Sequence, residues 1–170
     1  MAKTAADSAT DAARTRSASA ALKLEDFLPY RLNVLATLVS QALSRIYTGR
    51  YGIGISEWRV LVTLGQHGAM TGKTIGTQSH MHKTKVSRAV ALLEQRKLVA
   101  REVNRDDMRE AFLSLSAAGR AIYDELTPVA LDFARNLLDA VDATDRSAFD
   151  RAITSLTKYS ATLANAPDRG

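Results

Sequence analysis

Apolar residues recur at intervals of three and four along five stretches of the chain, the spacing that places them on one face of a helix. This pattern predicts helices over residues 27–47, 57–66, 83–97, 117–141 and 145–163, and a less regular short helix over 72–79. Strict alternation predicts strands over 99–103 and 111–115, joined by the polar stretch 104–109. Because an isolated hairpin is marginally stable, it must pack on the helices. We therefore expect a fold that is mainly α with a small β-hairpin.

Hydroxyl residues precede several of these helices, where a side-chain oxygen can accept a hydrogen bond from a free backbone N–H. The expected N-caps are Ser56, Thr71, Ser116 and Thr144. Pro128 falls inside the predicted helix 117–141 and is expected to kink it.

The predicted helix 83–97 has two unlike faces. Val86, Val90 and Leu93 share one face, and the opposite side carries small, polar and basic residues: Thr84, Lys85, Ser87, Arg88, Ala91 and Gln95. Small side chains let a helix enter a groove, hydroxyls bond phosphates or base edges, and arginine pairs with guanine in bidentate fashion. An ordinary solvated helix with a few basic residues is the alternative interpretation of this face.

Charge is concentrated around the same helix. The chain carries 23 basic and 18 acidic residues, for a formal charge of +5. Residues 73–105 hold eight basic and two acidic residues, a local charge of +6 that leaves the rest of the chain at −1. Such a basic segment within a balanced chain is typical of a nucleic-acid-binding surface.

The order of the central elements strengthens this interpretation. A short helix, a tight turn and the helix 83–97 together predict a helix-turn-helix, whose second helix docks in the major groove of DNA. The hairpin that follows resembles a wing, and Arg105 and Arg109 at its tip are placed to reach the adjacent minor groove.

Residues 79–119 (SHMHKTKVSRAVALLEQRKLVAREVNRDDMREAFLSLSAAG) resemble the winged helix-turn-helix core of the MarR family of bacterial transcription regulators. The stretch Thr84-Lys85-Val86-Ser87-Arg88 matches the pattern of the family's recognition helix, and Asp107-Met108-Arg109 matches the pattern of its wing. The resemblance covers about residues 24–163. Two positions depart from the pattern, because His80 stands where the family often has glycine and His82 where a better helix-capping residue is common.

The resemblance implies a homodimer built from N- and C-terminal helices and bound to double-stranded DNA. The resemblance also implies that Arg109 enters the minor groove and that Asp107 orients Arg109 by a charge-assisted hydrogen bond. The alternative interpretation is that Asp107 is a solvated turn residue. The full set of expected DNA-binding residues is Lys73, Thr84, Lys85, Ser87, Arg88, Arg105, Asp107 and Arg109.

The expected organisation has five parts, which together make a winged helix-turn-helix with N- and C-terminal dimerisation helices. They are a disordered N-terminal tail (1–22), an N-terminal dimerisation helix (23–55), a winged helix-turn-helix DNA-binding lobe (56–116), C-terminal dimerisation helices (117–165) and a short tail (166–170).

Family members commonly release DNA when a small molecule binds, and the segments FLPYRLNVL and GRYGIGISEWRVL look similar to regulators of aromatic-acid catabolism. This implies a repressor with an aromatic acid or its CoA thioester as effector. The candidate ligand-binding residues are Tyr30, Arg31, Tyr47, Tyr51, Trp58 and Tyr123. The alternative interpretation is that each of these residues belongs to the core or to an interface and binds no ligand.

Composition narrows the remaining function classes. The absence of cysteine excludes disulfides, thiolate zinc sites and thiol redox sensing, and with three histidines we expect no metal and no cofactor. No glycine-rich phosphate loop or nucleophile elbow is present, so we do not expect an enzyme. With no apolar run of membrane-spanning length and no secretory signal, we expect no membrane partner and a cytoplasmic location. The rival function is a non-specific architectural DNA-binding protein.

Overall fold

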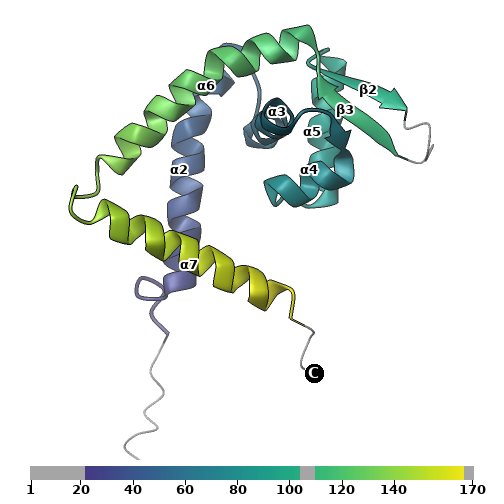
Figure 1. Cartoon of the computed structure of the whole chain (residues 1–170). Coiled ribbons are helices and arrows are strands. Elements are labelled where there is room, and N and C mark those ends of the chain that lie inside the picture. The colour runs from purple at the N-terminus through teal and green to yellow at the C-terminus, as the bar shows by residue number, and fades with distance from the viewer. Residues whose placement is uncertain (1–21, 104–109, 167–170) are drawn as a thin grey trace, which may run out of the picture. The chain divides into compact units, whose positions relative to one another are not determined.

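The computed structural model describes residues 22–103 and 110–166. Figure 1 shows a mainly helical chain with one small sheet, as the pattern of apolar residues predicts. Its elements are α2 (Leu28–Tyr51), α3 (Ile55–His67), β1 (Met70–Thr71), α4 (Gly72–Ser79), α5 (Lys83–Gln95), β2 (Val99–Val103), β3 (Ala111–Leu115), α6 (Ala117–Leu138) and α7 (Arg146–Ala164).

The chain divides into two compact units, Met1–Ala42 and Leu43–Gly170. Helix α2 crosses the boundary as one continuous helix, and its last turns belong to the second unit. In the first unit, α2 exposes several large apolar side chains, including Leu28, Leu35 and Leu38. The second unit holds every residue of the buried core described below.

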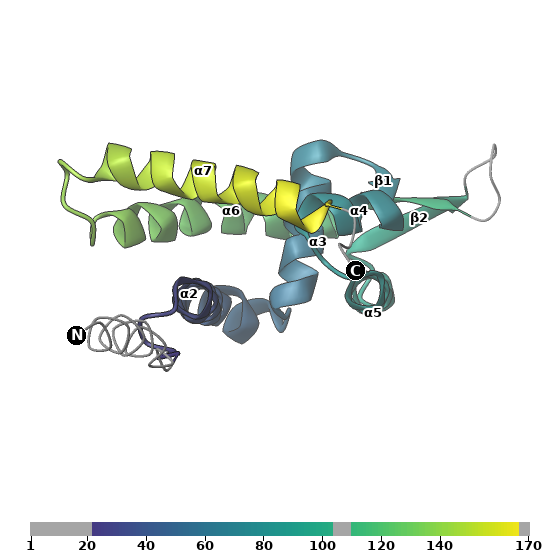
Figure 2. The same cartoon turned by 90° about the horizontal axis from the view of Figure 1, so that it is seen from below.

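The sheet is antiparallel with strand order β1–β3–β2. Val99 pairs with Leu115 and Val103 with Ala111, so β2 and β3 form the expected hairpin, which Figure 2 shows extending away from the helices. The third strand was not expected. At two residues, Met70 and Thr71, β1 is too short to produce a visible alternation in the sequence, and its pairing with β3 depends on the turn that brings it there.

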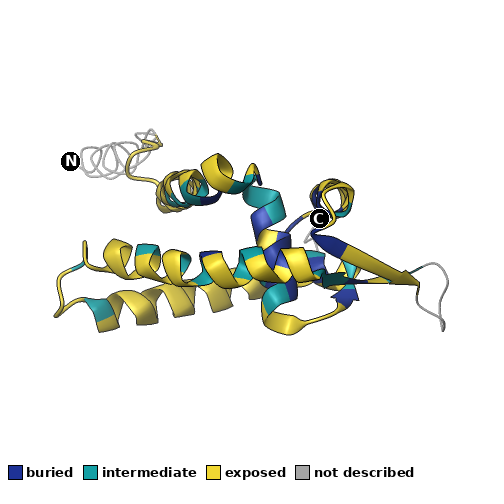
Figure 3. Ribbon diagram, turned by 90° about the horizontal axis from the view of Figure 1, so that it is seen from above, coloured by how far each residue is buried: buried dark blue, intermediate teal, exposed yellow. Residues whose placement is uncertain are grey.

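The core gathers around α3, which packs against α4, α5, α6 and β3. Val60, Leu61 and Leu64 are fully buried on this helix, and Figure 3 shows the buried residues concentrated there and on the neighbouring elements. From α5 the core receives Val86, Val90 and Leu93, which confirms the predicted inward face of that helix. Helix α7, by contrast, buries none of its residues.

Two of the four predicted N-caps are confirmed. The Thr71 hydroxyl accepts a hydrogen bond from the backbone N–H of Thr74, and that of Ser116 accepts one from Gly119. The other two predictions are wrong. Helix α3 begins after Gly54, so Ser56 already lies in its first turn. Before α7 the backbone at Asp145 is already helical rather than extended, so no cap side chain acts there, neither that of Asp145 nor that of Thr144.

Several predicted helix ends are also corrected. Helix α2 runs four residues further than expected because Gly49 does not interrupt it, and it stops where Gly52 turns left-handed. Helix α5 ends at Gln95, before the left-handed Lys97, and α6 ends at Leu138. Pro128 lies inside α6, which Figure 1 shows as one continuous, curved helix, and the kink expected at this residue stays a prediction.

Helices α4 and α5 both end in a Schellman motif with a non-glycine residue in the left-handed conformation. After α4, the N–H of Met81 donates to Gly76 and that of His80 to Thr77, with His80 at φ 51°. After α5, the N–H of Leu98 donates to Leu93 and that of Lys97 to Glu94. The backbone at His80 explains why glycine suits this turn.

We predict that His80→Gly raises the free energy of unfolding by about 1 kcal/mol, because it removes the cost of a left-handed side-chain-bearing residue. Chemical denaturation measures this change. Gln78→Gly, inside the same helix, is the control, and we expect it to lower stability by about 0.5–1 kcal/mol. A loss of stability in both variants would contradict the assignment of strain to His80.

Candidate nucleic-acid interface

The outer face of α5 is exposed as predicted. Thr84, Lys85, Ser87 and Arg88 are all exposed, whereas Ala89 is fully buried beside the inward stripe. The buried side chains anchor the helix in the core, so its outer face is held at the surface on a rigid element. Such a face of small, hydroxyl and basic side chains suits close approach to a groove of DNA.

The start of α5 is set by His82. Its backbone is extended at φ −64° and ψ 144°, and its Nδ1 accepts a hydrogen bond from the N–H of Thr84 at 3.4 Å. The position that departs from the family pattern therefore still caps the helix. The first turn of α5 contains no acidic residue, so the positive end of the helix dipole is not neutralised where the basic residues begin.

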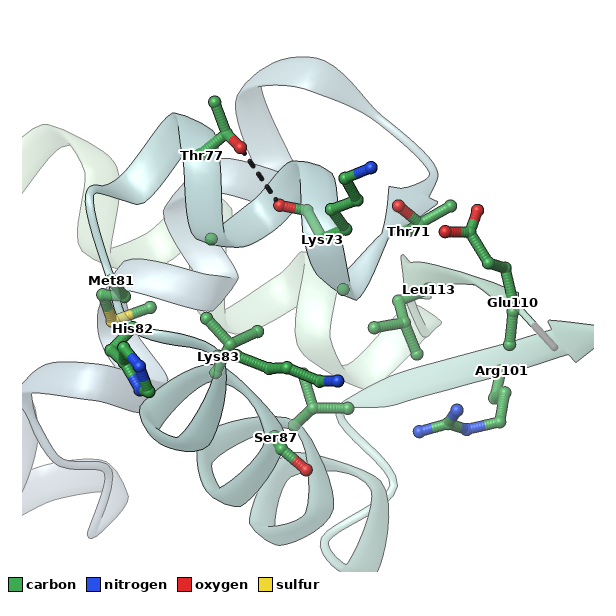
Figure 4. Close-up of a pocket in the computed structure, with 15 residues that line it drawn as sticks. Thr71, Lys73, Thr77, Met81, His82, Lys83, Ser87, Arg101, Glu110 and Leu113 are labelled. Atoms are coloured by element: carbon green, nitrogen blue, oxygen red, sulfur yellow. Dashed lines mark hydrogen bonds between the residues drawn. The ribbon is translucent and has the colours of Figure 1, made fainter. Parts of the chain in front are cut away.

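A groove of about 820 Å³ lies between α4, α5 and the sheet. Its walls carry three cationic side chains and one acidic one, over a floor of apolar residues. Figure 4 shows Lys83 reaching into it from the start of α5, with Lys73 on α4 and Arg101 on β2. Lys83 was not among the predicted contacts, although it belongs to the basic cluster seen in the sequence.

Two groups can be distinguished among the basic side chains of the second unit. Arg96, Arg101 and Arg120 are held by partners within the chain. Within the described residues, no ion pair or side-chain hydrogen bond involves the charged group of Lys73, Lys83, Lys85 or Arg88. The second group keeps its donors available for an external anion, and its members surround the outer face of α5.

Arg101 ties the sheet to α5. Its guanidinium donates to both carboxylate oxygens of Glu94, at 2.7 and 3.0 Å, and this pairing raises the pKa of Arg101 above its usual value. The bidentate geometry orients the hairpin relative to α5. Neither residue was singled out from the sequence, because the pair forms between two elements whose packing the sequence pattern does not reveal.

The wing residues Arg105, Asp107 and Arg109 lie outside the described residues. Their expected roles in the minor groove stay predictions.

The candidate ligand residues occupy different environments. Tyr47 and Trp58 stack in the core with ring centroids 5.2 Å apart, and burial raises the pKa of Tyr47. Tyr30 and Arg31 are exposed on the part of α2 in the first unit. The Tyr51 hydroxyl donates to Glu125, which raises the pKa of Tyr51.

Tyr123 lies directly on the backbone of α3. A Cβ added at Gly65 would come within 2.4 Å of its ring. The guanidinium of Arg120 stands 5.2 Å from the ring centroid and donates to the carbonyl of Gly65 at 3.2 Å. The structure thus places Tyr123 in a helix contact. None of the candidate ligand residues lines the groove between α4, α5 and the sheet, as far as the described residues define it.

These elements define the class of the second unit. A helix-turn-helix with a basic outer face, followed by a hairpin hydrogen-bonded to a third strand, is a winged helix-turn-helix. In the part of the chain that the structure describes, no helix has the length and hydropathy to cross a membrane.

Comparison with known proteins agrees with this class. Residues 51–110 match the model of the MarR family. The Bacillus subtilis (strain 168) protein described as an uncharacterized HTH-type transcriptional regulator, YwoH, is 28% identical over 122 residues, which cover 72% of this chain and 88% of that protein. This chain is therefore similar to the MarR family over residues 51–110 and to a helix-turn-helix transcriptional regulator over 122 residues.

Solved structures also share the fold, and two of them illustrate the similarity. The S. aureus MepR–DNA complex aligns with a TM-score of 0.70 at 17% identity, over 78% of this chain and 98% of that one. Bordetella bronchiseptica BpsR aligns with a TM-score of 0.63 at 19% identity, over 75% of this chain and 98% of that one. The DNA binding of BpsR is regulated by 6-hydroxynicotinic acid.

Proposed function

We propose that the protein is a transcriptional regulator that binds a specific DNA site through α5. The observation that carries the proposal is the exposed outer face of α5, whose basic side chains have no ion-pair partner among the described residues while the opposite face is buried. An ordinary solvated helix would not need this combination of small hydroxyl residues around one central arginine. The match to the MarR family model over residues 51–110 supports the same function.

In the proposed complex, Thr84, Lys85, Ser87 and Arg88 enter the major groove. Arg88 pairs with a guanine and the hydroxyls contact base edges or phosphates. Lys73, on the far wall of the groove, binds a phosphate. Arg105 and Arg109, with Asp107 as an orienting partner, reach the minor groove.

The proposed active form is a homodimer. Helix α7 exposes a stripe of large apolar residues at helical spacing: Phe149, Ile153, Leu156 and Leu163. A contiguous apolar face of this kind on a helix with no buried residue favours a partner surface, and a second copy of the chain supplies one. Two recognition helices about 34 Å apart then read two half-sites of a pseudo-palindromic operator.

We predict that Ile153→Asp converts the dimer to a monomer, because it places a charge in the centre of the apolar stripe. Light scattering after gel filtration measures the mass, which we expect to fall from twice 18.4 kDa to 18.4 kDa. Thr154→Asp, on the side of α7 turned away from the stripe, is the control and should leave the dimer intact. A wild-type chain that is already monomeric would contradict the dimer.

We also propose that a small aromatic effector binds the protein and releases it from DNA. Regulation of DNA binding by 6-hydroxynicotinic acid in BpsR supports an aromatic acid as the class of ligand, and the CoA thioester of such an acid is the other candidate. Release of DNA on binding would make the protein a repressor. Such a ligand acts only if it favours a dimer with a different spacing of recognition helices. Titrating benzoate, hydroxybenzoates and benzoyl-CoA into the DNA complex tests this, and a complex that none of them releases would remove these ligands.

Selection of duplexes from a randomised pool tests the proposed function itself. The proposal predicts that the recovered DNA shares one site with dyad symmetry and half-sites about one helical turn apart. A pool without a common sequence would favour the architectural alternative, for which a basic surface alone is sufficient.

A further inference from the structure

Arg96 joins the end of the recognition helix to the end of α2. It is the residue directly after α5, and its side chain donates from Nη1 to the carbonyl of Gly52 at 3.1 Å and from Nη2 to the carbonyl of Tyr51. These acceptors lie 44 and 45 residues earlier in the sequence. The guanidinium of an exposed residue is therefore directed at the backbone of another helix.

The carbonyls that Arg96 contacts lie at and just after the C-terminal end of α2, where a helix lacks intrahelical partners and carries the negative end of its dipole. Gly52 turns left-handed there, at φ 57°, and the carbonyl oxygens of Tyr51 and Gly52 both accept from Arg96. A planar guanidinium meets two neighbouring acceptors at once, which the single ammonium of lysine does less well. The geometry is that of a clamp on the helix end.

The last turn of α2 is itself fixed in the second unit. Tyr47 and Ile53, on either side of the clamp, are each 1% exposed. Glu125 on α6 accepts from the Tyr51 hydroxyl and pairs with Arg50. Because this end of α2 is rigidly held, a side chain that binds it from α5 also fixes α5.

We infer that Arg96 is a positioning residue for DNA recognition, which holds α5 on the end of α2 so that the two recognition helices of the dimer keep one spacing. The inference rests on the proposed function. It assigns to Arg96 no contact with DNA, since its donors are directed to the carbonyls of α2. Its effect should therefore be seen in the spacing of half-sites that the protein accepts.

The test uses full-length protein and a duplex recovered by the wild type from a randomised pool, together with versions in which one base pair is inserted or deleted between the half-sites. Arg96→Met keeps the apolar stem and removes all donors, and Arg96→Lys keeps the charge. Lys97→Met is the matched control, because it removes one positive charge at the next residue without touching α2. Fluorescence anisotropy over a range of salt concentrations gives affinity and salt slope, and urea unfolding confirms that each variant is folded.

We expect Arg96→Met to lower affinity for the selected duplex about tenfold, within the range found for residues that act on binding without contacting the ligand. It should leave the salt slope unchanged and bind the three spacings nearly alike. Arg96→Lys should be intermediate, and Lys97→Met should retain the wild-type preference for one spacing.

Two results would overturn the inference. Arg96→Met with wild-type affinity and spacing preference would show that the clamp does not position α5. A salt slope reduced by about one, with equal weakening at every spacing, would make Arg96 a phosphate contact instead. If the wild type selects no common duplex, the proposed function fails first, so the two failures are distinguishable.

Discussion

Gly119→Ala is expected to lower the free energy of unfolding by about 3 kcal/mol, because the added methyl group would overlap backbone that cannot move aside. A Cβ at this position would lie 2.0 Å from the carbonyl oxygen of Leu98. That oxygen also accepts the N–H of Ser116 at 3.0 Å, and the Ser116 hydroxyl donates to the carbonyl of Lys97 at 2.7 Å. The first turn of α6 therefore packs directly against the connection between α5 and β2.

Chemical denaturation checks this prediction, with Gly49→Ala as the matched control. Gly49 is also inside a helix, but nothing lies within 4 Å of its added Cβ, so alanine should stabilise the protein by about 0.5–1 kcal/mol. If Gly119→Ala were as stable as the wild type, the close approach of α6 to Leu98 would be incorrect.

Arg88→Ala and Lys73→Ala should weaken DNA binding in different ways. Loss of a bidentate arginine–guanine pair costs about 1–3 kcal/mol of discrimination, so Arg88→Ala should reduce preference for the selected duplex over a scrambled one about tenfold to a hundredfold. Loss of a phosphate contact weakens binding to all sequences alike and reduces the salt slope by about one, which is the result expected for Lys73→Ala.

Anisotropy titrations on both duplexes at several salt concentrations separate these effects. Lys158→Ala is the control, since it removes a positive charge from α7 on the side opposite its apolar stripe. The same uniform loss in both variants, with no change of preference for Arg88→Ala, would mean that Arg88 contacts only the backbone of DNA.

The helical spacing of apolar residues was enough to predict the helices and the inward face of α5. Val86, Val90 and Leu93 are buried, and the opposite face is exposed. These results follow from local periodicity, which each helix carries in its own sequence. The helix ends were harder to predict, because they depend on the backbone conformations of single residues, such as the left-handed Gly52 and Lys97 and the extended Gly54, which the spacing of apolar residues does not reveal.

The candidate site was predictable where it lies on one element and not where it joins several. Thr84 and Arg88 could be placed on one exposed face from the sequence. The Glu94–Arg101 pair and the clamp of Arg96 on Tyr51 join residues 7 and 45 positions apart, across different elements, and no periodic pattern marks such pairs. The aromatic candidates could not be assigned from the sequence, because an aromatic ring at helical spacing is compatible with a core position and with a ligand pocket alike.

The most direct test of the proposed function compares the affinity of the wild-type protein for the selected duplex with its affinity for a scrambled duplex of the same length and composition, at one salt concentration. A sequence-specific regulator should bind the selected duplex about a thousandfold or more tightly. Equal affinities for the two duplexes would contradict specific recognition by α5 and would favour a non-specific architectural protein.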